Sequence, residues 1–229
     1  MTRAFSAETT GTAMVRVFGA SSLTLVLPLA AFVLSIFLVA GSARAAAPDA
    51  ESDPVAFLQV FSDRAIAMLA DDSLSKEERA REFRSLLQSG FDMERIGRAV
   101  LGRYWRSATP EQRAEFLKLF EEFVVLFYAD RLSDYSGETL QIGKAHVRGD
   151  RDALVRSRVL SPDRPAVAVD WRLQRTAEGW RIVDVMIEGV SMTITHRSEF
   201  AAVISNSPGR IEGLLQKLRE KTATAGRRA

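Results

Sequence analysis

The spacing of apolar residues changes twice along this chain, and the change restricts the folds that the chain can adopt. Between residues 53 and 134 apolar residues recur every three or four positions, as they do on helices. From 138 to 195 they alternate with polar residues, as in half-buried strands, and after 198 the helical spacing returns. This order predicts an α+β domain with a helical layer packed on a curved antiparallel sheet of four or five strands.

Capping signals mark where the first helices begin. Asp53 precedes a proline at the first helical position, and Ser75 stands three residues before a glutamate, which is a capping box. Asp92 is expected to cap a third helix, and Thr109 combines a cap with a following proline. These helices are expected to end near Ala70, Gly90, Gly102 and Asp134.

Turn sequences divide the following segment into strands. Arg-Gly-Asp at 148–150, Ser-Pro-Asp at 161–163 and Ala-Glu-Gly at 177–179 are typical of hairpin turns. They predict an antiparallel meander, which a short fifth strand and two closing helices would follow. The expected strands are 139–147, 153–160, 166–175, 180–188 and 190–195, and the closing helices are 198–205 and one that begins at Ser207-Pro208.

The first 47 residues have the pattern of an export signal. Two arginines precede an uncharged run of eighteen residues, 23–40, and small residues follow it, so cleavage is expected after Ala45 or Ala47. Because a run of that length approaches the roughly 20 residues that span a bilayer, retention as a membrane anchor is a second interpretation. Either outcome predicts that the rest of the chain lies outside the cytoplasm, with one domain over 48–221 and a flexible basic tail over 222–229.

Composition excludes several classes of function. Three of the 31 basic and one of the 29 acidic residues lie in 1–47, so the remainder carries 28 of each and is formally neutral. A neutral chain without a long basic run does not predict nucleic-acid binding. The chain has no cysteine, which excludes disulfides and thiol chemistry.

Candidate catalytic groups are few, and no metal or cofactor is expected. No nucleophile-elbow, zinc-protease or phosphate-loop motif occurs. His146 and His196 are fifty residues apart, so each is expected to be a surface or capping residue. Asp184 lies within an apolar strand, where a carboxylate needs a partner. We expect a cross-strand arginine, Arg156, Arg158 or Arg172; the alternative is a general base in a curved-sheet isomerase or hydrolase.

Residues 91–140 concentrate large apolar side chains, with five phenylalanines, one tryptophan and three tyrosines but no histidine. Such a stripe at helical spacing is either protein core or the wall of a cavity for an apolar ligand. The polar tips of the tyrosines and of Trp105 suit a rim where a cavity meets water, and the strand at 180–188 is apolar on both faces. These features favour a carrier of an apolar ligand.

Two longer stretches, 91–138 and 169–204, resemble the MlaC family of periplasmic phospholipid-binding proteins, which belong to the Mla (toluene-tolerance) transport system. The resemblance covers about residues 55–220. The matching elements are Phe91, Leu101-Gly102, Trp105, Thr109 to Gln112, Phe116, Phe120, Tyr128, Tyr135, Trp171, Trp180, Asp184, Gly189-Val190-Ser191 and Phe200.

The resemblance implies a nuclear-transport-factor-2-like core with acyl chains held between helices and sheet. It also implies a phospholipid carrier, not an enzyme, that maintains outer-membrane lipid asymmetry. The implied partners are an inner-membrane ABC transporter complex with an MCE domain and an outer-membrane lipoprotein complex. One branch of the family accompanies hopanoid biosynthesis, so a hopanoid or other polycyclic lipid is the alternative cargo.

Periodicity selects the residues expected to contact the lipid. They lie on the inward faces of the helix at 110–134 and of the strands, and a shift of one residue in strand parity would exchange Val185 for Asp184 and Met186. A membrane-tethered assembly factor, with its apolar face filled by side chains alone, is a third interpretation. The expected lipid contacts are Val100, Leu101, Trp105, Phe120, Phe123, Val124, Phe127, Val169, Trp171, Val185, Ile187 and Met192.

Overall fold

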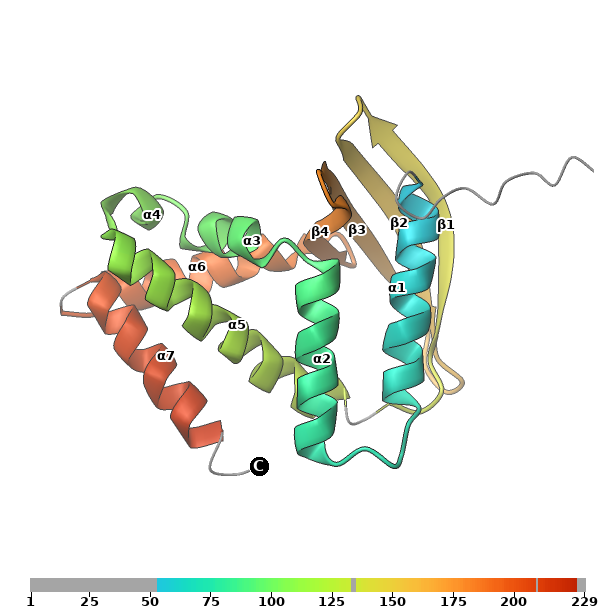
Figure 1. Ribbon diagram of the computed structural model, residues 1–229, viewed down its shortest axis with the longest axis horizontal. Helices are drawn as coiled ribbons and strands as arrows, with labels where there is room; N and C mark the ends of the chain where they lie inside the picture. The colour runs from blue at the N-terminus through green and yellow to red at the C-terminus, as the bar shows by residue number, and fades with distance from the viewer. Residues whose placement is uncertain (1–52, 133–134, 209, 226–229) are drawn as a thin grey trace, which may run out of the picture. The chain divides into compact units, whose positions relative to one another are not determined.

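The computed structural model describes residues 53–132, 135–208 and 210–225 (Figure 1). The expected signal peptide, 1–47, and the end of the expected tail, 226–229, lie outside the described residues. Helices precede and follow the strands, as the spacing predicted. The elements are α1 (Pro54–Leu69), α2 (Lys76–Gly90), α3 (Met93–Leu101), α4 (Tyr104–Ser107), α5 (Pro110–Leu132), β1 (Thr139–Arg148), β2 (Asp152–Leu160), β3 (Val167–Thr176), β4 (Gly179–Ile187), β5 (Val190–Ser191), α6 (Met192–Ser205) and α7 (Ile211–Ala225).

Both predicted capping boxes are present. The Ser75 hydroxyl accepts a hydrogen bond from the Glu78 backbone N–H, and the Glu78 carboxylate accepts one from the Ser75 backbone in return. Thr109 and Gln112 make the same reciprocal pair at the start of α5. These local bonds satisfy amide groups that have no partner inside the helix, which explains why the two helix starts could be read from sequence.

The five strands form one antiparallel sheet in the order β1-β2-β3-β4-β5. Its cross-strand pairs gather apolar residues on one face; Val155, for example, pairs with Trp171, and Trp171 pairs with Val185. The register shifts between Arg172 and Leu173. This bulge lets Ile182 and Val185 share the apolar face, which simple alternation along β4 would not allow.

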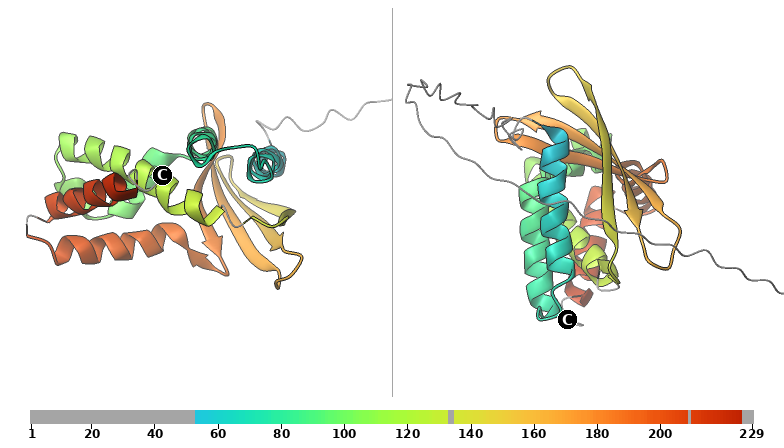
Figure 2. Two further views of the ribbon diagram at one scale, coloured as in Figure 1. Left: turned by 90° about the horizontal axis from the view of Figure 1, so that it is seen from below. Right: turned by 90° about the vertical axis from the view of Figure 1, so that its right-hand side faces the viewer.

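One end of this apolar face is covered by α1. Leu58 of α1 is fully buried, and its cluster includes Val155, Leu173, Trp180 and Ile182 of the sheet. Helix α1 contacts β1 and β2, and Figure 2 shows it beside the curved sheet. The first helix and the sheet therefore share a core of their own.

A second apolar cluster lies among the helices, around α5. That helix contacts α2, α3 and α7, and residues of α6 join the cluster. Phe116 and Val125 lie nine positions apart, which places them on opposite sides of the helix, yet neither has any exposed surface. Leu117 also packs against the cluster. Because α5 has neighbours on several sides, its burial is wider than the single apolar face predicted from spacing.

The predicted fifth strand, 190–195, was too long. Strand β5 ends at Ser191 and α6 begins at Met192, six residues before the expected helix start. The Ser191 hydroxyl caps α6 by accepting a hydrogen bond from the Ile194 backbone N–H at 3.1 Å. The β-branched residues that suggested a strand therefore lie in the first turn of a helix.

Two further helices differ from the prediction. Helix α4 was not expected. The last helix, α7, was expected to begin at Ser207-Pro208 and to end before 222, but it begins at Ile211 and continues to Ala225. The first residues of the expected tail, 222–225, are thus helical. The apolar side predicted for the last helix is buried, since Ile211, Leu214, Leu215 and Leu218 are all in the helical cluster.

The two clusters meet at β4. Phe91, which follows α2, packs against both clusters, and it forms a parallel bridge with Ile182. The Asp92 backbone N–H donates to the Ile182 carbonyl at 3.0 Å. Among the described residues, none of the helices combines the length and apolar character needed to cross a bilayer.

Candidate functional site

The apolar face of the sheet extends from the part that packs against α1 toward the end of β4. Trp171 and Val185 still pack against the cluster of α1, with the Trp171 ring 6.1 Å from that of Phe61, whereas Val169 and Ile187 lie outside that cluster. Val169 pairs with Ile187, and the neighbouring pair is Trp171 with Val185. Directly paired residues lie on the same face, so these four side chains form a single surface, here called the distal sheet patch. Val169 is buried and Trp171 and Val185 are half-buried, whereas Ile187 is 38% exposed.

Polar atoms within the distal sheet patch are satisfied internally. The Trp171 indole N–H donates to the Ser157 hydroxyl at 2.9 Å, and that hydroxyl donates to the Val169 carbonyl at 2.6 Å. Ser157 is itself buried. Because these donors are occupied, the patch presents hydrocarbon without unpaired polar groups, as a surface for an apolar ligand requires.

Aromatic side chains of α5 and α6 form the helical counterpart. Phe123 and Phe127 stack with their ring centroids 5.4 Å apart, and Phe200 of α6 packs edge-on to Phe123. Phe127 and Tyr128 are half-buried. The C-terminal half of α5 therefore carries the aromatic residues that are less enclosed than Phe116 and Phe120.

The expectation that His196 is a surface or capping residue was wrong. His196 is 8% exposed, its Nε2 lies 3.3 Å from the Tyr128 hydroxyl and its Nδ1 lies 3.0 Å from the Glu199 carboxylate. The early start of α6 causes the difference, because it places His196 within the helix and against α5. His146 lies exposed in β1, as expected.

The expected lipid contacts do not all lie together. Val169, Trp171, Val185 and Ile187 come together in the distal sheet patch, while Phe123, Val124 and Phe127 share the helical cluster. Met192, half-buried, is the first residue of α6. Their contact with lipid stays a prediction.

Three of the expected contacts lie deep in the helical cluster. Val100, Leu101 and Phe120 are at most 2% exposed. Side chains this enclosed are already packed against protein, so contact with a ligand would require the helices to separate.

Asp184 contacts none of its three expected arginine partners in the described part of the chain, and it lacks the setting of a general base. It is 6% exposed, and its two carboxylate oxygens accept from the Ser191 hydroxyl at 2.7 Å and from the Thr193 backbone N–H at 3.1 Å. Arg172 is its neighbour in register, but Asp184 makes no ion pair among the described residues. The carboxylate therefore fixes the start of α6 onto β4.

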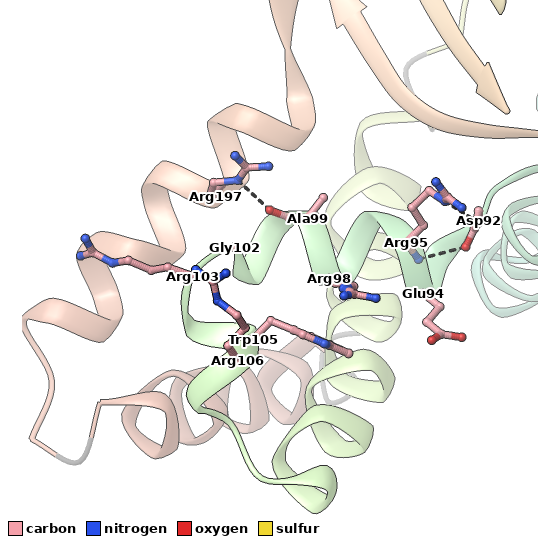
Figure 3. Close-up of a pocket in the computed structure, with 10 residues that line it drawn as sticks. All are labelled: Asp92, Glu94, Arg95, Arg98, Ala99, Gly102, Arg103, Trp105, Arg106 and Arg197. Atoms are coloured by element: carbon pink, nitrogen blue, oxygen red, sulfur yellow. Dashed lines mark hydrogen bonds and ion pairs between the residues drawn. The ribbon is translucent and has the colours of Figure 1, made fainter. Parts of the chain in front are cut away.

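Sequence reasoning missed a charged hollow of about 820 Å³ between α3, α4 and α6 (Figure 3). A regular signal was present, because α3 and the segment 103–106 each contribute two arginines three residues apart. Trp105, expected to touch lipid, lies here and not beside the sheet, and charged neighbours do not suit acyl chains. The arginine hollow is defined by Arg95, Arg98, Arg103, Arg106, Arg197 and Trp105.

Two known proteins resemble this chain over different shares of its length. The intermembrane phospholipid transport system binding protein MlaC of Haemophilus influenzae is 26% identical over 200 residues, covering 84% of this chain and 90% of that protein. The toluene tolerance protein ttg2D of Pseudomonas putida is 24% identical over 111 residues, which is 48% of this chain and 52% of the relative.

A solved structure agrees with the fold. The phospholipid-binding protein of Ralstonia solanacearum, determined in complex with a phospholipid, is 27% identical with a TM-score of 0.67. The match covers 76% of this chain and 99% of that one. The α+β fold with a curved antiparallel sheet, expected from sequence, is thereby confirmed. The family model described as MlaC protein matches residues 59–220, and the chain therefore belongs to the MlaC family.

Proposed function

We propose that this protein is a periplasmic carrier that binds a phospholipid by its acyl chains and moves it between membranes without transforming it. The observation that carries the proposal is the distal sheet patch, an apolar surface with satisfied polar atoms in a fold shared with a phospholipid-bound protein. The name of the Haemophilus influenzae relative and the description of the solved structure mention phospholipid, and none of the three names mentions a hopanoid, so the hopanoid alternative gains no support.

The energetics of a lipid in water explain why a carrier needs such a surface. A diacyl lipid has on the order of 30 methylene groups, and exposing them costs about 0.8 kcal/mol each, or roughly 25 kcal/mol in all. Transfer through water unaided is therefore negligible. A carrier must cover most of this hydrocarbon while making few directional bonds, so that the cargo can be passed on.

The proposed site has a sheet wall and a helical wall. Val185 and Ile187 of the distal sheet patch would contact acyl chains from one side, and Phe123 and Phe127 from the other. Acyl chains between them would lie where the two apolar clusters approach at β4. Loading and release would then require the helices to move relative to the sheet.

Export and partners belong to the same proposal. The pattern at 1–47 supports delivery to the periplasm. The mass of the exported chain distinguishes the two interpretations, since a retained anchor would leave residues 23–40 in place. The family suggests an inner-membrane MCE-domain transporter complex and an outer-membrane lipoprotein complex as donor and acceptor. The internal bonds of Asp184 favour a carrier over an isomerase or hydrolase.

Native mass spectrometry of the exported protein, followed by lipid extraction, tests the proposal. The wild-type protein should carry bound phospholipid. Replacing Ile187 by glutamate removes an apolar contact worth about 1.5–3 kcal/mol, so lipid affinity should fall roughly tenfold to a hundredfold. Because Ile187 is 38% exposed, the variant should still fold. Val185→Glu and Phe123→Glu should lose the lipid as well.

Leu160→Glu is the matched control. Leu160 is 37% exposed, close to the value for Ile187. Ser157 pairs with Val169 and so lies on the face of the distal sheet patch, and strand alternation places Leu160 on the opposite face. This variant should retain lipid like the wild type. The proposed function would be refuted if the purified wild-type protein carries no lipid and takes up no phospholipid from liposomes. Equal retention by Ile187→Glu and the wild type would place the site elsewhere.

A further inference from the structure

The arginine hollow carries a strong excess of positive charge although the mature chain is formally neutral. Seven charged side chains line it, the five arginines together with Asp92 and Glu94. Asp92 is already engaged, because its carboxylate accepts from the Arg95 backbone N–H at 2.9 Å and from Arg95 Nε at 3.2 Å. Four arginines thus share the hollow with one other carboxylate, that of Glu94.

Several of these guanidinium groups are available to a ligand. Within the described residues, the side chains of Arg98 and Arg106 form no hydrogen bond or ion pair, and both are exposed. In the described part of the chain, the one hydrogen bond that the Arg103 side chain donates goes to the Tyr104 hydroxyl at 2.8 Å. Like charges held together without counter-charges repel, so an anionic partner would relieve an unfavourable interaction.

The backbone holds the hollow in shape. Arg197 of α6 donates from Nε to the Ala99 carbonyl at 2.6 Å, which joins α6 to the last turn of α3 (Figure 3). Its two terminal nitrogens make no hydrogen bond to any residue that the structure describes. Gly102 ends α3 with φ of 58°, and a side chain there would lie 3.3 Å from Arg197 Cδ. The absence of a side chain at Gly102 therefore leaves room for Arg197.

The composition of the hollow fits a protein surface better than a free ion or a bilayer. All its cations are arginine, whose planar group binds carboxylates through two parallel hydrogen bonds. Trp105 is half-buried beside them, with Arg113 stacked 5.5 Å from its ring centroid. Arginine and tryptophan are the residues enriched at the energetic centres of protein interfaces. A flexible lysine-rich surface would be expected for non-specific attraction to anionic lipid.

We propose that the arginine hollow is the docking site for a carboxylate-rich surface of a partner protein. The proposal rests on the proposed function, since a carrier must meet a donor or acceptor, but it uses a different surface from the distal sheet patch. The two surfaces share no residue, so docking and lipid binding can be disrupted separately.

Photo-cross-linking in cells of the source organism tests the proposal. The full chain carries the photo-reactive residue p-benzoylphenylalanine at Glu94, which is exposed and lines the hollow, or at Gln141 of β1 as a control. Irradiation should link position 94 to a protein at a segment rich in aspartate and glutamate, identified by mass spectrometry. Position 141 should not give that product.

Charge reversal then establishes the chemistry of the contact. The triple variant R98E/R103E/R106E should lose the product at least tenfold, and replacing acidic residues of the linked segment by lysine should restore it. The matched control R148E/R158E/R175E changes three exposed arginines outside the hollow by the same charge and should behave as wild type. If the reversed variant does not fold, R98Q/R103Q/R106Q should show the same loss.

Four outcomes would overturn the proposal. They are the absence of a protein product at position 94, a product at a segment without acidic residues, an equal loss in both triple variants, and loss of bound phospholipid along with docking. Flotation with vesicles of equal parts phosphatidylcholine and phosphatidylglycerol, if abolished by the hollow variant alone, would assign the surface to a membrane instead. An empty wild-type protein that still gives the product would refute the proposed function and leave the docking site intact.

Discussion

Removal of the Asp184 side chain should destabilise the protein through the junction of β4 and α6. Asp184→Ala deletes two hydrogen bonds to a carboxylate, one from the Ser191 hydroxyl and one from the Thr193 backbone N–H. Bonds to a charged group contribute about 1.5–3 kcal/mol each, and a negative charge at a helix N-terminus adds about 0.3–1 kcal/mol. Because Ser191 and Thr193 are only half-buried, water can replace part of the loss. We expect a decrease of about 2–4 kcal/mol in the free energy of unfolding.

Two further variants separate charge from geometry. Asp184→Asn keeps one acceptor oxygen but loses the charge, and it should cost about half as much as the alanine variant. Ser191 also caps α6, so Asp184 and Ser191 should be coupled. The double variant Asp184→Ala/Ser191→Ala should show an interaction energy of about 1–2 kcal/mol, within the range for residues in one network.

Urea unfolding followed by far-ultraviolet circular dichroism provides the measurement. A loss of about 2–4 kcal/mol corresponds to a decrease in Tm of roughly 5–15 °C for a chain of this size. Asp72→Ala is the control, because Asp72 is exposed and its side chain makes no hydrogen bond among the described residues. A change below about 0.5 kcal/mol for Asp184→Ala, the size expected for a surface substitution, would refute the capping role.

Two other predictions concern the helices. Gly90→Ala would place Cβ 2.4 Å from Phe61 Cε2, so the ring must move; urea unfolding should show a loss of about 1–3 kcal/mol, and a neutral result would mean that α1 and α2 separate easily. The hydrogen bond from Arg219, 2.7 Å long, lowers the pKa of Glu115 below its ordinary value of 4.5. Folded protein then binds fewer protons than unfolded protein, so this contribution is complete above about pH 4.5 and lost on acidification. The difference in unfolding free energy between wild type and Glu115→Gln should stay constant well above pH 4.5 and decrease as the pH falls through the lowered pKa of Glu115; a difference that does not change with pH would exclude the linkage.

Features set by neighbouring residues could be predicted from the sequence. The caps at Ser75 and Thr109 depend on residues three positions away, and the strands follow from alternation and turn chemistry. Trp171 and Val185 were both expected on the inward face of the sheet, and the structure pairs them. The bulge beside Leu173 was not, because it depends on how two strands pair and not on either strand alone.

Features set by distant residues could not be predicted. The segment 190–195 is rich in β-branched residues and suggests a strand, but Asp184, seven residues before Ser191, holds that serine as a helix cap. Burial of His196 follows from the same shift. The arginine hollow needs Arg197 to lie beside Arg98, almost one hundred residues earlier, which only the packing of α6 against α3 produces.

The separation into two apolar clusters bears on how a cargo could be exchanged. Leu58 and Trp180 are buried in one cluster and Phe116 in the other, so each cluster encloses its own core. Acyl chains entering between them would displace contacts at the boundary, around Phe91, and leave both cores packed. Opening a single continuous core would instead create a cavity. The loss of stability would be about 2–5 kcal/mol for each large side chain that is separated from its neighbours. If the proposed function holds, a fold with two cores joined at β4 would allow lipid to enter and leave without unfolding either one.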